Sequence, residues 1–198
     1  MTNKKYSIIL ADPPWKYQQG KSMGTNFQGA ADAQYDRMDY KDICKLPIPD
    51  LADEDCVLFM WATFPLLQEA LEVIKAWGFE YKTLGFSWIK TNADGSPFFG
   101  VGYYAKSNCE VCLMATKGKA HSLVKSNSVS SALIHPRMRH SAKPPIVRDL
   151  IVKLFGDIPR IELFARKDTK VDLWGKNTFD GWDVFGNEVE GSIDLGQY

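Results

Sequence analysis

The stretch Ser7-Ile8-Ile9-Leu10-Ala11-Asp12-Pro13-Pro14-Trp15 decides how the rest of the chain is interpreted. Its first five residues are small or apolar, which predicts a buried strand of a parallel sheet. Asp12 and the two prolines after it cannot continue that strand. Because open α/β sheets bind ligands beyond the carboxyl ends of their strands, Asp12 and Trp15 lie where chemistry is expected.

Two interpretations of this turn compete. In the first, the prolines hold the Asp12 carboxylate and nearby carbonyls at fixed angles, and Trp15 offers a flat face for stacking. Those features suit a planar ring that carries an amino group. In the second, the turn only closes a strand and Trp15 is a core residue. The stacking in the first interpretation requires an accessible Trp15.

The remaining apolar pattern alternates between strands and helices, which predicts an α/β fold with a mainly parallel sheet flanked by helices. A helix that opens at Pro65 and ends at Gly78 has its apolar positions at Leu67, Ala70, Leu71, Ile74 and Trp77. The other expected elements are a helix capped by Asp39 and ending at Cys44, a helix over 144–155, and strands over 57–62, 83–90, 110–116, 161–164 and 182–185.

A chain of 198 residues is expected to form one domain, residues 1–198. Within it we expect a mobile active-site loop over 16–38, a basic substrate loop over 117–142 and a tail over 189–198. Cys109 and Cys112 have odd spacing on an expected strand, so they should face apart and hold no metal. Neither a signal peptide nor a membrane span is visible, which predicts a soluble, cytoplasmic protein.

The charge distribution is uneven although 24 basic residues balance 24 acidic ones. The segment 116–148 contains no Asp or Glu and seven cations, so the rest of the chain carries a net charge of minus seven. A charge run is commonly only a solvated face. The alternative is a phosphate-contacting segment, since clustered cations release counterions from a polyanion. Its cations are Lys117, Lys119, Lys125, Arg137, Arg139, Lys143 and Arg148.

The turn and three further motifs resemble the MT-A family, the adenine-N(6) methyltransferases related to the catalytic subunit of the messenger-RNA adenosine methyltransferase. The motifs are Ala11-Asp12-Pro13-Pro14-Trp15, Trp88-Ile89-Lys90-Thr91-Asn92, Ser141-Ala142-Lys143-Pro144, and Glu162-Leu163-Phe164-Ala165-Arg166 with Gly186-Asn187. The similarity covers about residues 6 to 188. It implies a single-domain Rossmann-like methyltransferase of the small prokaryotic or phage type, permuted so that the catalytic motif precedes the cofactor strand.

The resemblance implies S-adenosylmethionine as cofactor, S-adenosylhomocysteine as product and no metal. Lys143 matches the lysine that pairs with the methionine carboxylate, and Asp12 belongs to the same site. Asp168 stands where the messenger-RNA enzymes have histidine, and Glu188 where they have glutamine. The implied cofactor-binding residues are Asp12, Lys143, Glu162, Arg166, Asp168, Asn187 and Glu188.

For the substrate, the resemblance implies adenine held by Asp12, Pro13, Pro14 and Trp15. The Asp12 carboxylate and the Pro13 carbonyl would accept the amine hydrogens, and Trp15 would stack on the ring. The expected substrate-binding residues are Trp15, Lys16, Lys90, Asn92, Lys117, Lys119, Arg137, Arg139 and His140. The aromatic residues Phe98, Phe99, Tyr103 and Tyr104 either stack bases or anchor their loop.

DNA is favoured over RNA as the substrate. The motif order is shared with one class of bacterial DNA amino methyltransferases and with the messenger-RNA family, and the compact chain has no room for a large recognition domain. Short sequence specificity, a homodimer or a partner subunit would fit so small a chain. The main alternative is a catalytically silent partner that holds nucleic acid with the same fold. A cytosine target is the third possibility, although it more often goes with Ser at the first motif position and Tyr at the last.

Overall fold

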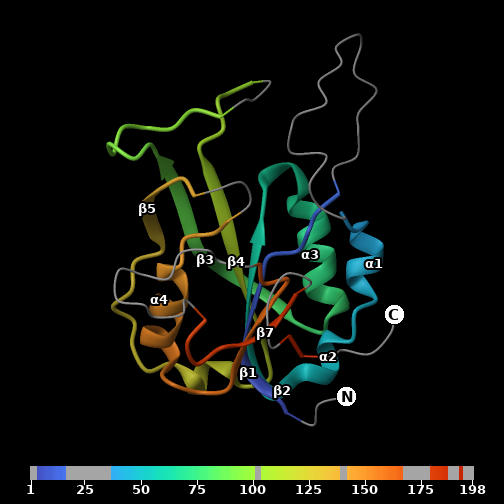
Figure 1. Ribbon diagram of the computed structural model, residues 1–198. Helices are drawn as coiled ribbons and strands as arrows, with labels where there is room; N and C mark the ends of the chain where they lie inside the picture. Colours follow the sequence, from blue (N-terminus) through green and yellow to red (C-terminus); the bar gives the residue numbers. More distant parts are fainter. Residues whose placement is uncertain are drawn as a thin grey trace.

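The computed structural model describes residues 4–16, 37–100, 104–138, 142–166, 179–186 and 192–193. Within these residues, seven strands form one sheet in the order β5-β3-β4-β2-β1-β6-β7 (Figure 1). The strands are β1 (Tyr6–Ala11), β2 (Ala52–Ala62), β3 (Glu80–Thr91), β4 (Cys109–Lys117), β5 (Ala132–Pro136), β6 (Arg160–Leu163) and β7 (Asp183–Phe185). The helices are α1 (Tyr40–Cys44), α2 (Ile48–Leu51), α3 (Leu67–Ala76) and α4 (Ile146–Phe155), with 3-10 turns at Phe64–Leu66 and Ala120–Leu123.

The sheet is mainly parallel, as the sequence predicts. β1 pairs in parallel with β2 and β6, β6 with β7, and β3 with β5. β4 is the exception, because it runs antiparallel to both β2 and β3. The amino end of β4 therefore lies at the same edge of the sheet as the carboxyl ends of β1, β2 and β3. We call this edge the carboxyl edge.

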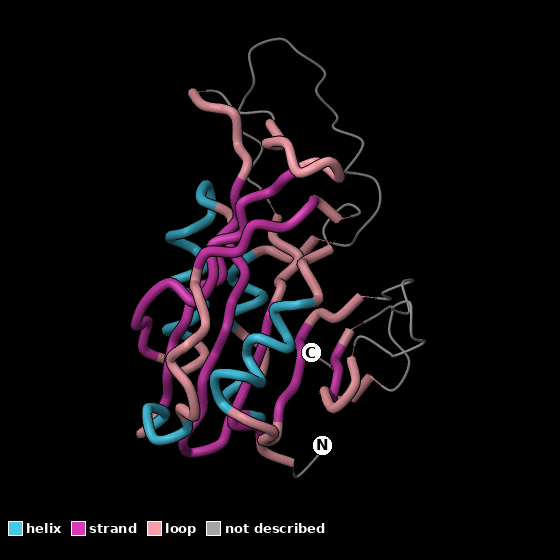
Figure 2. Tube along the Cα trace, turned by 90° about the vertical axis from the view of Figure 1, so that its left-hand side faces the viewer, coloured by secondary structure: helices cyan, strands magenta, loops and turns pink. Residues whose placement is uncertain are grey.

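Helices cover both faces of the sheet and bury two apolar layers. α3 packs one face through Ala70, Val73 and Ile74, and α4 packs the other through Val147, Ile151 and Phe155. Figure 2 looks onto the side that carries α4 and shows the strands rising together from the end near the N-terminus. In the described part of the chain, no helix is long and apolar enough to cross a membrane.

Most expected elements are present, with three corrections. Leu71 was expected on the packing face of α3 but is 37% exposed, because Val73 occupies that face instead. The one-turn helix α2 was not predicted. The segment 117–142, expected as a loop, contains the 3-10 turn Ala120–Leu123 and the edge strand β5.

Candidate active site

The turn after β1 begins at the carboxyl edge and is fixed by backbone hydrogen bonds. The Asp12 N–H donates to the Leu163 carbonyl oxygen over 3.4 Å, which joins the turn to the end of β6. The Trp15 N–H donates to the Pro13 carbonyl oxygen over 2.9 Å, a three-residue turn centred on Pro14. The Met38 N–H donates to the Pro14 carbonyl oxygen over 2.9 Å. The turn is therefore rigid on both sides.

Asp12 forms an ion pair with Lys143, the residue three positions before α4. Lys143 Nζ lies 2.7 Å from Asp12 Oδ1, and both side chains are less than one fifth exposed. Burial raises the pKa of Asp12 above its ordinary value, and the positive charge of Lys143 opposes that rise. Burial would lower the pKa of Lys143, but Asp12 and Glu110 raise it. Lys143 therefore keeps its charge and supports the ionised form of Asp12.

Two further charges extend this pair. Glu110, near the start of β4, has Oε2 3.5 Å from Lys143 Nζ and forms a second ion pair with Lys90 at the end of β3. Burial would raise the pKa of Glu110, but Lys143 and Lys90 together lower it. Glu110 is a site residue that the sequence analysis missed, and a carboxylate in the apolar run 109–115 was the available signal.

β6 brings Arg166 to the same site. Phe164, directly after β6, has a φ of 61°, which is uncommon for a bulky residue. Its ring packs against Phe185 of β7, and the Ala165 N–H donates to the Phe185 carbonyl oxygen over 2.9 Å. The chain turns sharply here, so that the charge of Arg166 acts on both Asp12 and Lys143.

The structure corrects the stacking role expected for Trp15. Its side chain belongs to the apolar layer under α3 and is only 9% exposed. The indole Nε1–H donates to the Trp61 carbonyl oxygen over 3.1 Å, inside the protein. An indole buried in this way cannot offer a full face to a base, so Trp15 anchors the turn as a core residue. Pro14 and Asp12 remain partly exposed.

Glu162 lies on the opposite side of the sheet from Trp15, facing α4. Its two carboxylate oxygens accept from Arg148 over 2.5 and 3.0 Å, and both side chains are about nine-tenths buried. Arg148 was counted among the cations of the basic segment, but this pair removes it from the surface. The cofactor contact expected of Glu162 stays a prediction.

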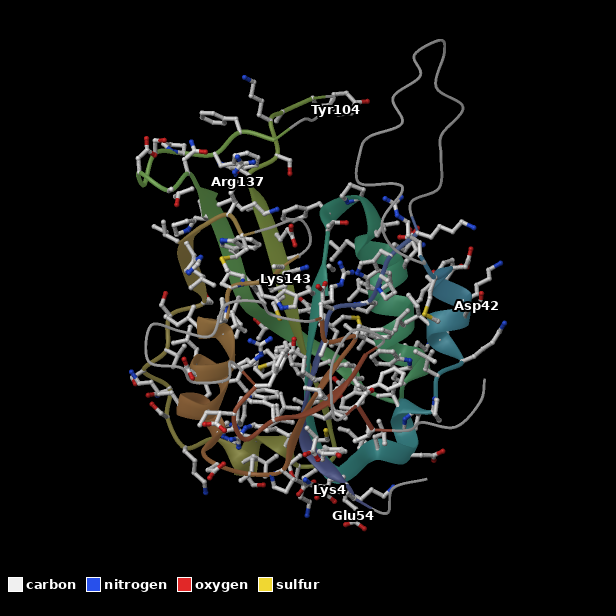
Figure 3. All side chains as sticks on the ribbon, viewed as in Figure 1. Lys4, Asp42, Glu54, Tyr104, Arg137 and Lys143 are labelled. Carbon is white, nitrogen blue, oxygen red and sulfur yellow. The ribbon has the colours of Figure 1, made fainter. Side chains whose placement is uncertain are left out.

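Lys117 and Lys119 lie away from the candidate site, contrary to the expected basic loop. Lys117, the last residue of β4, pairs with Cys56 of β2, whereas Ala11, the last residue of β1, pairs with Met60 of the same strand. Four residues at about 3.3 Å each put the two levels roughly 13 Å apart along the sheet. The Lys119 N–H donates to the Asp55 carboxylate at that far end, near Glu54 at the bottom of Figure 3.

The other expected substrate residues that the structure describes, Lys16, Lys90, Asn92 and Arg137, lie at the carboxyl edge. Arg137 follows β5, donates its backbone N–H to the Thr91 carbonyl oxygen and has its guanidinium 4.8 Å from the Phe98 ring centroid. Figure 3 places Arg137 and Tyr104 above Lys143, at the same end of the molecule. Asn92 donates to Ser96 Oγ and the Pro97 carbonyl oxygen, so its side chain organises the loop between β3 and β4.

Lys16 is exposed directly after the turn. Phe99 and Tyr104 are 59% and 105% exposed, so these two rings are not tucked onto the core. Several expected site residues lie outside the described residues: Arg139, His140, Asp168, Asn187 and Glu188. Tyr103, most of the segment 16–38 and most of the tail 189–198 also lie outside them.

Comparison with known proteins agrees with the motifs. The MT-A70 family matches residues 6–188, the span indicated by the motif resemblance. The chain is 35% identical over 202 residues to the type II methyltransferase M.MunI of a Mycoplasma species, covering 96% of this chain and 80% of that protein. It is 25% identical to the human N(6)-adenosine-methyltransferase catalytic subunit METTL3, covering 94% of this chain but 29% of that protein.

A third relative is the Arabidopsis thaliana N6-adenosine-methyltransferase non-catalytic subunit MTB. It is 30% identical over 122 residues, which cover 58% of this chain and 14% of that protein. The family match extends over the whole set of elements that build the carboxyl edge, from β1 to β7. The chain therefore belongs to the MT-A70 family, and its sheet has the Rossmann-like methyltransferase fold.

Proposed function

We propose that this protein transfers a methyl group from S-adenosylmethionine to the 6-amino group of adenine in nucleic acid, with DNA favoured over RNA. The observation that carries the proposal is the buried Asp12–Lys143 pair at the carboxyl edge of a chain matched by the MT-A70 family. The chain's similarity to M.MunI over most of both lengths supports an enzyme of this size.

The charges at the edge fit the amino-acid end of the proposed cofactor. That end carries one carboxylate and one ammonium group, and Lys143 and Asp12 supply one partner of each sign. Arg166 adds a second cation nearby. When bound, the cofactor supplies the methyl group from its sulfonium. We propose that Asp168, Asn187 and Glu188 contact its ribose and adenine, and that Glu162 supports the same site.

Asp12 and Pro13 would prepare the amine. The amine lone pair of adenine is delocalised into the ring, so acceptors on its hydrogens favour the tetrahedral geometry that attack requires. An ionised carboxylate has several lone pairs, so Asp12 can accept from the amine while Lys143 holds Oδ1. The Pro13 carbonyl accepts from the Trp15 N–H and keeps a second lone pair. Both oxygens would stabilise the positive charge that develops on the amine.

The target base has to leave its stack to reach this turn, at a cost of roughly a few kcal/mol for a paired base. Lys16, Lys90, Arg137, Arg139 and His140 are the proposed contacts to the strand. Lys117 and Lys119 are not, because they lie at the other end of β4. We propose a cytoplasmic location, or the host cytoplasm for a phage-borne gene, and either a homodimer or a partner subunit.

A second candidate function is a catalytically silent partner, and the similarity to the non-catalytic subunit MTB favours it. An intact carboxylate held by Lys143 argues against that role, because a silent subunit does not need it. Calorimetry distinguishes the two: heat on titrating S-adenosylmethionine supports the enzyme, and no heat supports the silent partner.

The direct test is transfer of a labelled methyl group to DNA and to RNA of matched sequence. We expect label on DNA, and loss of transfer on the order of 10²–10³-fold in Asp12→Ala, because one preorganised acceptor is removed. Asp42→Ala is the matched control, since Asp42 is an exposed aspartate on α1 that pairs with Lys45. Label on RNA alone would change the substrate, and label on neither would reject the proposal.

A further inference from the structure

Glu110 is a largely buried acidic residue at the carboxyl edge to which the proposed mechanism gives no task. It lies at the second position of β4, level with Trp88 of β3, and its side chain is 18% exposed. The antiparallel direction of β4 is what brings it there. In a parallel strand the same residue would start at the opposite edge, beside Lys4 and Glu54.

Its carboxylate lies between two lysines from different elements. Lys90 reaches Glu110 Oε1 from the end of β3, and Lys143 reaches Oε2 over 3.5 Å from the segment before α4. With Asp12 the order of charges is Lys90, Glu110, Lys143, Asp12, alternating in sign. The four side chains are each between 16% and 22% exposed.

Aromatic rings pack against these four charged side chains and restrict the positions of the two lysines. Lys90 Nζ lies 4.9 Å from the Trp88 ring centroid, and Lys143 Nζ lies 5.7 Å from that of Trp61. The two indoles meet edge to face, with centroids 6.4 Å apart. Lys143 therefore has a ring on one side and two carboxylates, at unequal distances, on the others.

We propose that Glu110 is a positioning residue, which holds Lys143 against Asp12 and is itself fixed by Lys90. This inference rests on the proposed function, because it assumes that Asp12 takes part in methyl transfer. Removing the Glu110 charge would leave Lys143 with Asp12 alone, and the lysine would no longer be held between two anions.

A change at Glu110 should also reach Asp12 electrostatically. The charges that shift the pKa of Asp12 are those of Lys143, Glu110 and Arg166. The Asp12 charge in turn raises the pKa of the buried Cys112 thiol. Among these, burial raises the pKa of Asp12 most, Lys143 lowers it and Glu110 raises it. Loss of the Glu110 charge therefore lowers the pKa of Asp12.

The competing explanation is a brace, in which Glu110 only ties β4 to β3 through Lys90. The experiment compares Glu110→Gln, Glu110→Asp and the double variant Lys90→Gln/Glu110→Gln in the full chain. Glu80→Gln is the matched control, because it removes an exposed carboxylate that faces Lys82 on the same strand β3. Melting temperatures separate unfolding from loss of function.

We expect Glu110→Gln to lower kcat roughly tenfold to a hundredfold, the order of loss caused by misplacing a reacting group by about 1 Å. The acid limb of its pH–rate profile should move to lower pH. The double variant should stay at least as slow, since Lys90 is also a proposed contact to the strand. Glu110→Asp should recover part of kcat, and Glu80→Gln should match the parent. Recovery of kcat in the double variant, or an unmoved acid limb, would overturn the positioning role.

A second readout does not depend on activity. Carbon-13 NMR titration of the Asp12 carboxyl in the protein without nucleic acid should give a lower pKa in Glu110→Gln than in the parent. If the parent methylates no nucleic acid, the proposed function fails while this titration still decides the inference. An identical Asp12 titration in both proteins would overturn it.

Discussion

Asp12 is a carboxylate whose surroundings pull its proton affinity in opposite directions. Burial favours the neutral acid, whereas Lys143 and Arg166 favour the anion. A buried ion pair of this kind is weak evidence for stability, because the loss of hydration offsets most of the attraction between the charges. A buried carboxylate whose pKa is shifted by burial and by a neighbouring cation is more typical of a functional site.

The pH dependence of activity should reflect this environment. Asp12 accepts most strongly from the amine, and stabilises the charge that develops on it, when it is ionised. Burial raises the pKa of Asp12 above the ordinary value of aspartate. The rate should therefore fall as the pH drops through that raised pKa, so the acid limb of kcat/KM lies above the ordinary aspartate range. An acid limb at or below that range would mean that Asp12 titrates as a solvated side chain.

Trp15 gives a prediction that separates its two possible roles. Trp15→Phe removes the indole N–H and leaves the Trp61 carbonyl oxygen without that donor. A buried acceptor that loses its partner costs about 1–3 kcal/mol, so the denaturation midpoint should fall. Phe64→Leu changes a ring that is 55% exposed and should leave the midpoint nearly unchanged. Unchanged stability of Trp15→Phe with a raised KM for nucleic acid would restore the stacking role.

At the scale of elements, the ends of β4 decide which charges enter the site. Its first residues supply Glu110 to the carboxyl edge, and its last residues carry Lys117 and Lys119 to the other edge. The turn that follows is tight, because Gly118 has a φ of 64° beside the backbone of Glu54. Because β4 ends at Lys117 and β5 runs parallel to β3 up to Pro136, the basic segment begins at one edge of the sheet and returns to the other.

Two glycines test the turn. A Cβ at Gly118 would lie 2.2 Å from the Glu54 carbonyl oxygen, whereas a Cβ at Gly95 would meet nothing within 4 Å. Both have positive φ, so alanine at either costs roughly 1–2 kcal/mol in backbone strain. Gly118→Ala should lose clearly more free energy of unfolding than Gly95→Ala. Equal losses in urea denaturation would mean that the close approach to β2 is absent.

The helices were predicted correctly where the spacing of apolar residues and the capping or helix-breaking residues indicated the same boundary. The expected helix starts at Asp39 and Pro65 and the expected helix end at residue 155 agree with the structure within two residues. β5 was missed, because a five-residue edge strand with one buried side chain, Leu133, has little pattern to detect. The antiparallel direction of β4 could not be predicted from the sequence, because an apolar run does not indicate the direction of a strand.

For the whole molecule, the described cations of the segment 116–148 do not form one surface, although they are close together in the sequence. Lys117 and Lys119 lie at one edge, Arg148 is buried against Glu162, and Lys143 is paired with Asp12. Arg137 is the remaining described cation of the segment 116–148 at the carboxyl edge, and it is exposed. Proximity in sequence therefore overstated the size of the basic surface near the site.

This division predicts different effects of two exposed cations on binding of nucleic acid. Arg137→Gln should weaken binding and reduce the slope of log K against log salt by about 1, the loss expected for one phosphate contact. Lys119→Gln should leave both affinity and slope unchanged, because Lys119 lies at the far edge. Fluorescence anisotropy over a range of salt concentrations measures both. Equal effects of the two variants would contradict the layout.

The site itself was predictable in part. The motif order brought Asp12, Lys143 and Arg166 together correctly, because β1 and β6 are neighbours in a parallel sheet. The burial of Trp15 was one of two interpretations that the residues allowed, since its exposure depends on how the turn meets β2 and α3. Glu110 required the register of β3 against β4, which is a property of the folded sheet.

The most direct test of the account is nucleoside analysis by mass spectrometry of DNA incubated with the protein and S-adenosylmethionine. The account predicts 6-methyl-deoxyadenosine as the product, formed by the parent and reduced on the order of 10²–10³-fold with Asp12→Ala. Methylated cytosine, or 6-methyl-deoxyadenosine formed equally well by Asp12→Ala, would contradict it.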